Sequence, residues 1–143
     1  MLPSSGDLQM ALPPQKFREI VFQLLYSKDF TESAPEAIPF IMETLKVARH
    51  YVADADLKVQ GIIAHLVEID DRIQKSSTEY SFDRISKVEL TILRLGIYEL
   101  MYVTGVPPKV ALAEAVRLCR KFGTPESAHF VNAILDEVYT RSG

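Results

Sequence analysis

The stretch Ser86–Tyr102 (SKVELTILRLGIYELMY) decides the fold of this chain. It opens with a capping box, because the Ser86 side chain can accept a hydrogen bond from the Glu89 amide and the Glu89 carboxylate can reach back to the Ser86 amide. Gly105 and the two prolines that follow it supply the stop. The sequence therefore predicts one well-bounded helix here.

Apolar side chains cover most of the circumference of this predicted helix. With one residue every 100°, the polar side chains fall on one narrow stripe, made of Lys87, Thr91, Arg94, Tyr98 and Tyr102. The apolar residues spread over most of the remainder: Val88, Leu90, Ile92, Leu93, Leu95, Ile97, Leu100 and Val103. A helix that is apolar on most sides has neighbours on most sides, so we predict that the other helices pack around it.

Helical patterns also account for the rest of the chain. The predicted helices and turns are Lys16–Phe30, a helix capped by Ser33 that carries apolar residues up to Val47, a helix from Asp54 or Asp56 to about Lys75, a short turn at Phe82–Ile85, Lys109–Phe122, and a last helix capped by Thr124. Gly61 lies inside the third of these, where it would allow close packing. No period-two run competes with these patterns. The sequence predicts one all-α domain of about seven helices over residues 13–143, after a loose tail at residues 1–12.

Composition and charge limit the function classes. The apolar content is 48% and the net charge is −3, which excludes a disordered chain and argues against a generic nucleic-acid binder with a strong basic excess. The single cysteine, Cys119, permits no intramolecular disulfide, and its position in a helical pattern predicts a small buried residue. No segment approaches the ~18 apolar residues of a membrane span, and residues 1–12 do not resemble a signal peptide.

The sequence contains no motif of an enzyme. It has no P-loop, no dinucleotide-binding glycine pattern and no zinc-ligand spacing, so we expect no catalytic residue, metal or cofactor. Glu99 falls among apolar neighbours, and a buried carboxylate must be paired. We therefore predict that Glu99 is a structural carboxylate held by a basic side chain or a helix start, and that Arg94 joins helices through its planar fork. Residues alone predict a binding module.

Three segments in the C-terminal half resemble the NusB family in order and spacing. They are Val88–Leu100 (VELTILRLGIYEL), Val106–Val116 (VPPKVALAEAV) and Phe122–Asp136 (FGTPESAHFVNAILD). The N-terminal half is looser, but Arg18-Glu19 followed by Gln23-Leu24-Leu25-Tyr26 is similar to the first helix of that family. The resemblance implies an all-α fold of two small helical subdomains around the central helix.

The resemblance also implies a function. Members of the NusB family are bacterial, hence cytoplasmic, transcription antitermination factors. They pair with NusE, a small-subunit ribosomal protein, and the pair binds the boxA element of nascent RNA. The complex helps RNA polymerase resist termination, notably on ribosomal RNA operons. No enzymatic step and no membrane is implied.

Residues carried over from the family place an RNA surface at the N-terminal segment and the start of the last helix. Helix-start amides and an exposed aromatic ring suit phosphates and unstacked bases. The implied RNA-binding residues are Lys16, Arg18, Lys121, Glu126, Ser127, His129 and Phe130. Tyr26 and Glu89 match positions near the RNA or partner surface, although the capping box already explains Glu89. The core is the alternative for Phe130, and a solvated surface for His129.

The chain departs from the family at its N-terminus. Many relatives carry an arginine-rich run there, whereas this chain has only Lys16 and Arg18. Fewer phosphate contacts mean weaker, less salt-dependent binding, so we predict weak RNA binding without NusE. Five acidic residues could attract a basic partner or form a solvated face: Asp54, Asp56, Glu68, Asp70 and Asp71.

Two other functions remain open. NusB-like domains also occur as accessory RNA-binding parts of RNA cytosine methyltransferases, but this chain ends at Gly143 without room for a methyltransferase domain. A helical interaction protein that has lost RNA binding is the other alternative. The chain could be a monomer or a homodimer, and a dimer could cover the RNA-facing surface.

Overall fold

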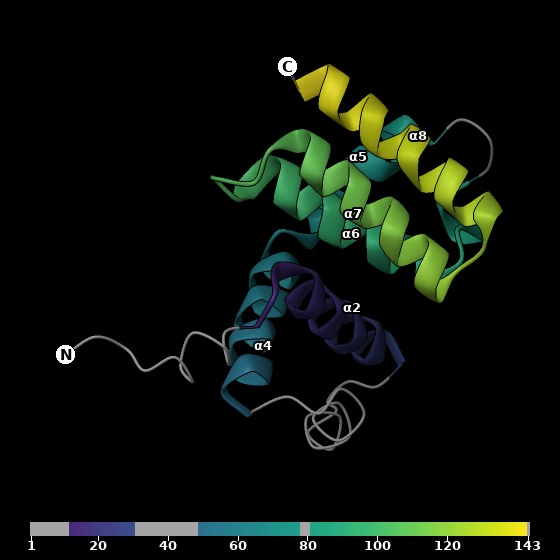
Figure 1. Ribbon diagram of the computed structural model, residues 1–143. Helices are drawn as coiled ribbons and strands as arrows, with labels where there is room; N and C mark the ends of the chain where they lie inside the picture. The colour runs from purple at the N-terminus through teal and green to yellow at the C-terminus, as the bar shows by residue number, and fades with distance from the viewer. Residues whose placement is uncertain (1–11, 31–48, 78–80, 143) are drawn as a thin grey trace.

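The computed structural model describes residues 12–30, 49–77 and 81–142, and within these ranges the chain is helical (Figure 1). The elements are α2 (Pro14–Phe30), α4 (Arg49–Ala64), α5 (Leu66–Ser76), the 3-10 turn η1 (Phe82–Arg84), α6 (Lys87–Tyr102), α7 (Pro108–Phe122) and α8 (Pro125–Ser142). The predicted all-α fold is confirmed. The helix predicted after Ser33 lies outside the described residues.

Helix α6 is the centre of the fold, as predicted. Ser86 Oγ accepts from the Glu89 amide and Glu89 Oε1 accepts from the Ser86 amide, each at 3.1 Å, so both halves of the capping box form. Gly105 has a positive φ of 89°, which an L side chain rarely adopts, and it ends the segment. Helix α6 packs against α2, α4, α5, α7 and α8. Its most deeply buried apolar residues are Ile92, Leu93, Leu95 and Ile97.

The polar stripe of α6 is covered along part of its length. Thr91 is fully buried and its hydroxyl donates to the Lys87 carbonyl at 2.7 Å. Arg94 is buried too, and its Nε and Nη2 each lie 2.9 Å from a carboxylate oxygen of Asp70 on α5. This paired geometry confirms that Arg94 joins two helices through its planar fork.

The helix predicted from Asp54 or Asp56 to Lys75 is two helices, so that prediction is wrong in its extent. The chain breaks at His65, whose amide donates to Ile62 O at 3.1 Å, three residues back instead of four. The His65 ring nitrogen Nδ1 lies 2.9 Å from the Gly61 carbonyl oxygen that the helix has left without its usual amide donor. A Cβ on Gly61 would lie 2.5 Å from the Tyr98 hydroxyl, which confirms the predicted close packing.

Helices α7 and α8 form a hairpin around Gly123. The Gly123 amide donates to Cys119 O at 2.7 Å, but its φ of −120° is open to any residue. Glycine is needed here for space, because a Cβ would lie 3.0 Å from that carbonyl and 3.3 Å from the Ser127 side chain. Thr124 caps α8 as predicted, with its hydroxyl accepting from the Ser127 amide at 3.1 Å.

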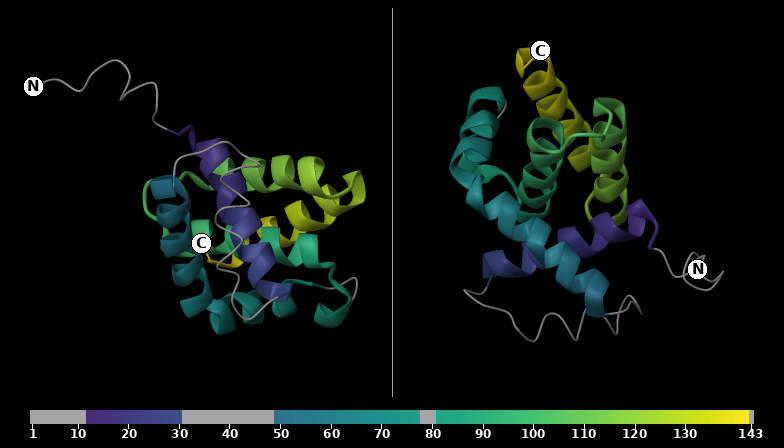
Figure 2. Two further views of the ribbon diagram at one scale, coloured as in Figure 1. Left: turned by 90° about the horizontal axis from the view of Figure 1, so that it is seen from below. Right: turned by 90° about the vertical axis from the view of Figure 1, so that its left-hand side faces the viewer.

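The described helices form two groups, with α2 and α4 packed together beneath α5, α6, α7 and α8 (Figures 1 and 2). Among the described residues, no helix has both the length and the apolar character needed to cross a lipid bilayer. The junction between the groups is the region where α2 meets α6 and α7, and it carries most of the buried charge.

Candidate functional site

Arg18 ties the two helical groups together. Its Nε lies 3.0 Å from both carboxylate oxygens of Glu99 on α6, and its Nη1 lies 3.1 Å from Glu114 Oε1 on α7. The side chain is only 10% exposed. The expectation that Arg18 contributes a phosphate contact at the surface is wrong, because two carboxylates from the second helical group hold it inside the junction.

Glu99 is a structural carboxylate, as predicted. Besides Arg18 it lies 3.7 Å from the ammonium group of Lys58 on α4, so one buried carboxylate links three helices. Burial lowers the pKa of Lys58, the Glu99 charge opposes that shift, and the Arg18 charge adds to it. The pairing accounts for the buried negative charge without any catalytic role.

A second layer of charges lies outside Arg18. Glu19 accepts from Lys121 Nζ and Arg117 Nη1, each at 2.8 Å, and Arg117 Nε is also 2.8 Å from Glu114. The carboxylates are deep, with Glu19 7% exposed, whereas Lys121 is 52% exposed. Glu114 is buried as well, at 7% exposed. The cations therefore cover the carboxylates and face the solvent.

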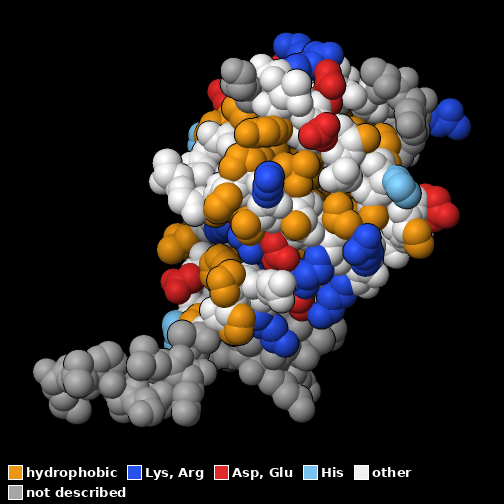
Figure 3. Space-filling view, turned by 45° about the horizontal axis from the view of Figure 1, so that its top comes forward, with side chains coloured by type: hydrophobic (Ala, Val, Ile, Leu, Met, Phe, Trp, Pro, Cys, Tyr) orange, Lys and Arg blue, Asp and Glu red, His pale blue; other side chains and the backbone are white. Residues whose placement is uncertain are grey.

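These cations continue into a basic band, which we define as Lys16, Arg117, Arg120 and Lys121; Arg120 and Lys121 are exposed, whereas Lys16 and Arg117 are half-buried. Lys16 stands at the start of α2 beside Gln15, whose carbonyl oxygen accepts from Arg117 Nη2 at 3.1 Å. Arg120, which directly precedes Lys121 on α7, is exposed. Lys and Arg side chains gather visibly on one part of the surface in Figure 3, with a histidine near them. The chain thus presents a local positive surface despite its net charge of −3.

The buried carboxylates beneath the band make stability depend on pH. Burial would raise the pKa of Glu19, but hydrogen bonds and charges from Lys121 and Arg117 lower it below 4.5 overall. Burial would likewise raise the pKa of Glu114, and Arg117 and Arg18 lower it overall. A carboxyl group with a lower pKa when folded stabilises fully above its unfolded pKa and loses that contribution as the pH falls through the folded pKa.

We therefore expect the free energy of unfolding to fall as the pH drops below about 4.5, the unfolded-state pKa of these groups. Urea denaturation at pH 7, 5 and 3.5 measures the decline. The variant E19Q removes one titrating group and should flatten it, whereas E126Q, at an exposed residue of α8, serves as the matched control. Identical pH profiles for E19Q and the unaltered chain would contradict a lowered Glu19 pKa.

The start of α8 presents only some of the predicted site residues to solvent. Glu126 and His129 are exposed, whereas Ser127 is buried and its hydroxyl lies 3.0 Å from that of Thr124. Phe130 is buried in the hydrophobic core. The expectation of an exposed aromatic face at Phe130 is therefore wrong, because the apolar face of α8 points this ring inward.

Two other predicted surface residues are held by local packing. Tyr26 is half-buried and stacks on Phe22 with ring centroids 5.8 Å apart, and Phe22 stacks in turn on Phe122 of α7. Glu89 is buried in the capping box. Cys119 is buried as predicted, and burial together with the Glu89 charge raises its pKa to about 12. A thiol with that pKa is protonated at neutral pH and unreactive.

Most of the acidic residues suggested as a partner surface bind other residues of the same chain. Asp70 pairs with Arg94 and Asp71 with Lys75. Asp56 lies 3.4 Å from Lys28, and Glu68 accepts a hydrogen bond from Tyr102. These internal pairs reduce the charge that the α4–α5 side offers to a basic partner.

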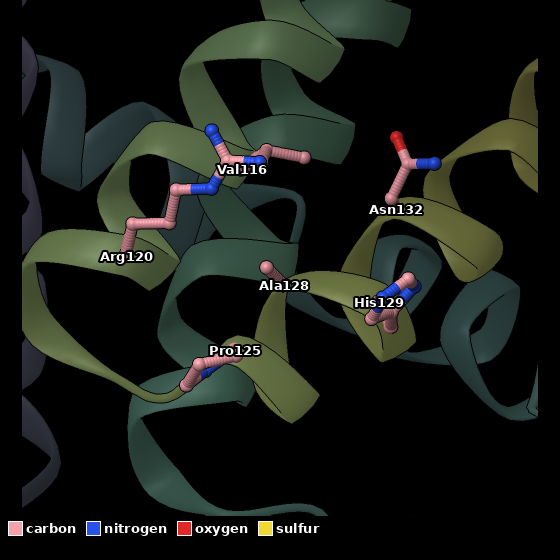
Figure 4. Close-up of a pocket in the computed structure, with 6 residues that line it drawn as sticks. All are labelled: Val116, Arg120, Pro125, Ala128, His129 and Asn132. Atoms are coloured by element: carbon pink, nitrogen blue, oxygen red, sulfur yellow. The ribbon is translucent and has the colours of Figure 1, made fainter.

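A groove of about 440 Å³ opens between α7 and α8. It is lined by Val116, Arg120, Pro125, Ala128, His129 and Asn132. Figure 4 shows Arg120 on one side, His129 and Asn132 on the other, and Ala128 between them. Sequence reasoning found His129 but missed Arg117, Arg120 and Asn132. These residues could have been identified from the sequence as basic and amide side chains on the two helices that flank the Gly123 turn.

Comparison with known proteins covers almost the whole chain. A family model described as NusB family matches residues 15–140. The transcription antitermination protein NusB of Geobacter sp. strain M21 is 39% identical over 130 residues, covering 85% of this chain and 90% of that protein. Its counterpart from Oceanobacillus iheyensis is 38% identical over 123 residues, covering 86% and 95%.

Solved structures agree with the sequence matches. T. maritima NusB has a TM-score of 0.76 and 31% identity, and the match covers 90% of this chain and 92% of that one. A crystal structure of the antitermination factors NusB and NusE in complex with dsRNA matches with a TM-score of 0.75 and 28% identity. That match covers 89% of this chain and 96% of that one.

Proposed function

Since this chain belongs to the NusB family, we propose that it is a transcription antitermination factor that binds boxA RNA together with NusE. The observation that carries this proposal is the family match over residues 15–140. No chemical step is involved, and the function is to help RNA polymerase pass terminators on nascent transcripts such as those of ribosomal RNA operons. Because nascent transcripts are made in the bacterial cytoplasm, the proposal also assigns the protein to that compartment.

The basic band supplies the electrostatic part of RNA binding. Lys121 and Arg120 reach solvent, while the carboxylates of Glu19 and Glu114 are buried and each bonded to two cations. A phosphate approaching the band therefore meets cations before carboxylates. The start of α8 contributes exposed His129 and Glu126 beside it. The buried residues Arg18, Ser127 and Phe130 pack beneath this proposed RNA surface.

NusE is the proposed partner because a solved relative with 28% identity to this chain was crystallised with NusE and dsRNA. The band has four cations, two of which are already paired with buried carboxylates. Few free charges mean modest affinity for RNA alone. The proposal therefore assigns much of the affinity to the complex with NusE.

The alternative of an accessory domain in an RNA cytosine methyltransferase receives less support. The chain matches 95% of the length of the Oceanobacillus iheyensis antitermination protein. A helical interaction module without RNA binding is the remaining alternative, and RNA titration separates it from the proposal.

The deciding experiment is titration of the purified chain with boxA RNA, with and without its cognate NusE, from 50 to 300 mM salt. We expect weak binding alone and tighter binding with NusE, with a log–log salt slope for the chain alone no steeper than about −3, given about 0.7 per single-strand phosphate and four cations. Tight, steeply salt-dependent binding by the isolated chain would refute the weak-binding prediction. No binding in either condition favours the interaction module.

A further inference from the structure

We propose that the groove between α7 and α8 binds one unstacked base of single-stranded RNA. This proposal rests on the proposed function, because it assigns a base-binding position to the same RNA surface. The groove residues that carry it are Arg120, His129 and Asn132, with Val116 and Ala128 as the apolar floor. Neither Arg120 nor Asn132 was identified from the sequence.

The groove has the volume of a small-ligand site. Its volume of about 440 Å³ lies in the range of about 300–1,000 Å³ that is typical of such sites. Apolar side chains form the floor and three polar side chains rise around it (Figure 4). An apolar floor excludes water from the faces of a flat ring, and a polar rim can bond to its edge.

The three polar side chains match the parts of a nucleotide. The Asn132 carboxamide offers a donor and an acceptor side by side, as the edge of an unpaired base requires. The His129 ring can stack on a base face, and the Arg120 guanidinium can hold a phosphate through two parallel hydrogen bonds. Among the residues that the structure describes, none of these three side chains is hydrogen-bonded or ion-paired within the chain.

The groove is continuous with the basic band. Arg120 belongs to both, and Lys121 follows it on α7. A strand whose phosphates follow Lys121 and Arg120 can therefore turn one base towards Ala128 without leaving the band. This continuity favours RNA, because one strand can place its phosphates on the cations of the band and a base in the groove at the same time.

The test uses the full chain with NusE and boxA oligonucleotides that carry 2-aminopurine at successive positions. We expect one position to change in fluorescence on binding, and N132A and H129A each to abolish that change and weaken binding at least about fivefold, the lower end for loss of one base contact. Gln74 is an exposed carboxamide on α5, so Q74A is the matched control and should bind normally.

Asn132 and His129 are exposed, so their replacement leaves the core intact, and circular dichroism verifies this. N132D keeps the shape but replaces a donor with a negative charge, and it should bind RNA no better than N132A. Unchanged RNA binding and fluorescence in N132A and H129A would overturn the base site while leaving the proposed function standing. Loss of NusE binding without RNA would overturn it in favour of a protein contact.

Discussion

Replacing Arg18 by methionine is expected to lower the free energy of unfolding by about 3–5 kcal/mol. Methionine preserves much of the volume but removes the cation that both Glu99 and Glu114 bind. Glu99 is 2% exposed, so water cannot take the place of the guanidinium. A buried carboxylate without its partner is costly, which makes this single charge more important than most apolar contacts at the junction.

Lys58 limits how far the R18M substitution lowers the free energy of unfolding. Its ammonium group is 3.7 Å from Glu99, and removing Arg18 also removes the repulsion that helps lower the Lys58 pKa. Lys58 therefore becomes a better partner for Glu99 and holds the loss towards the lower end. Urea denaturation measures it, with R141M as the control for an exposed pair worth below about 1 kcal/mol.

A second variant separates the charge from the packing. In R18M/E99M the Glu99 carboxylate is gone, Glu114 keeps its bond to Arg117, and Lys58, which is 19% exposed, keeps contact with solvent, so we expect the double variant to be more stable than R18M. Equal stability of the two would mean that Glu99 is indifferent to Arg18. A loss of under 1 kcal/mol in R18M would show that the two helical groups do not depend on this ion pair.

Local signals allowed much of the fold to be predicted from sequence. The capping box of Ser86 and Glu89, the Thr124 cap and the stop at Gly105 each depend on residues within a few positions of one another. Each of these interactions can therefore be recognised from a short stretch of sequence. The central position of α6 followed in the same way, because a helix that is apolar on most of its circumference has neighbours on most sides.

Partners distant in sequence explain the errors. Arg18 lies 81 residues from Glu99 and 96 from Glu114, and no local pattern indicates that the three meet. A basic residue near the N-terminus therefore looked like a phosphate contact. The break at His65 was not predicted for a different reason. The apolar periodicity continues from α4 into α5, although the His65 amide donates to the carbonyl three residues back instead of four.

The candidate site was only partly predictable because it is built from three helices. His129 and Lys121 could be identified from the family pattern, but a groove exists only once α7 and α8 pack. Arg120 and Asn132 became meaningful when the structure placed them on opposite sides of Ala128 (Figure 4). Because Phe130 is buried, the aromatic ring that the start of α8 offers to RNA is that of His129, which is exposed.

The double substitution R120Q/K121Q is expected to weaken binding of boxA RNA about 25-fold at 0.1 M salt. Each single-strand phosphate contact contributes about 0.7 to the log–log salt slope, so two contacts contribute about 1.4, which is about 25-fold at 0.1 M relative to 1 M. Glutamine removes the charge at both positions without adding a carboxylate next to Glu19. The slope should become shallower by the same 1.4.

The salt series distinguishes this effect from loss of the base site. Neutralising phosphate contacts changes both the affinity and the slope, whereas N132A lowers affinity at every salt concentration and leaves the slope unchanged. K75Q removes an exposed lysine of α5 that pairs with Asp71, and it serves as the control for loss of one positive charge away from the basic band. An unchanged slope in R120Q/K121Q would mean that RNA phosphates do not follow the basic band, and RNA contacts would then have to be sought elsewhere on the chain.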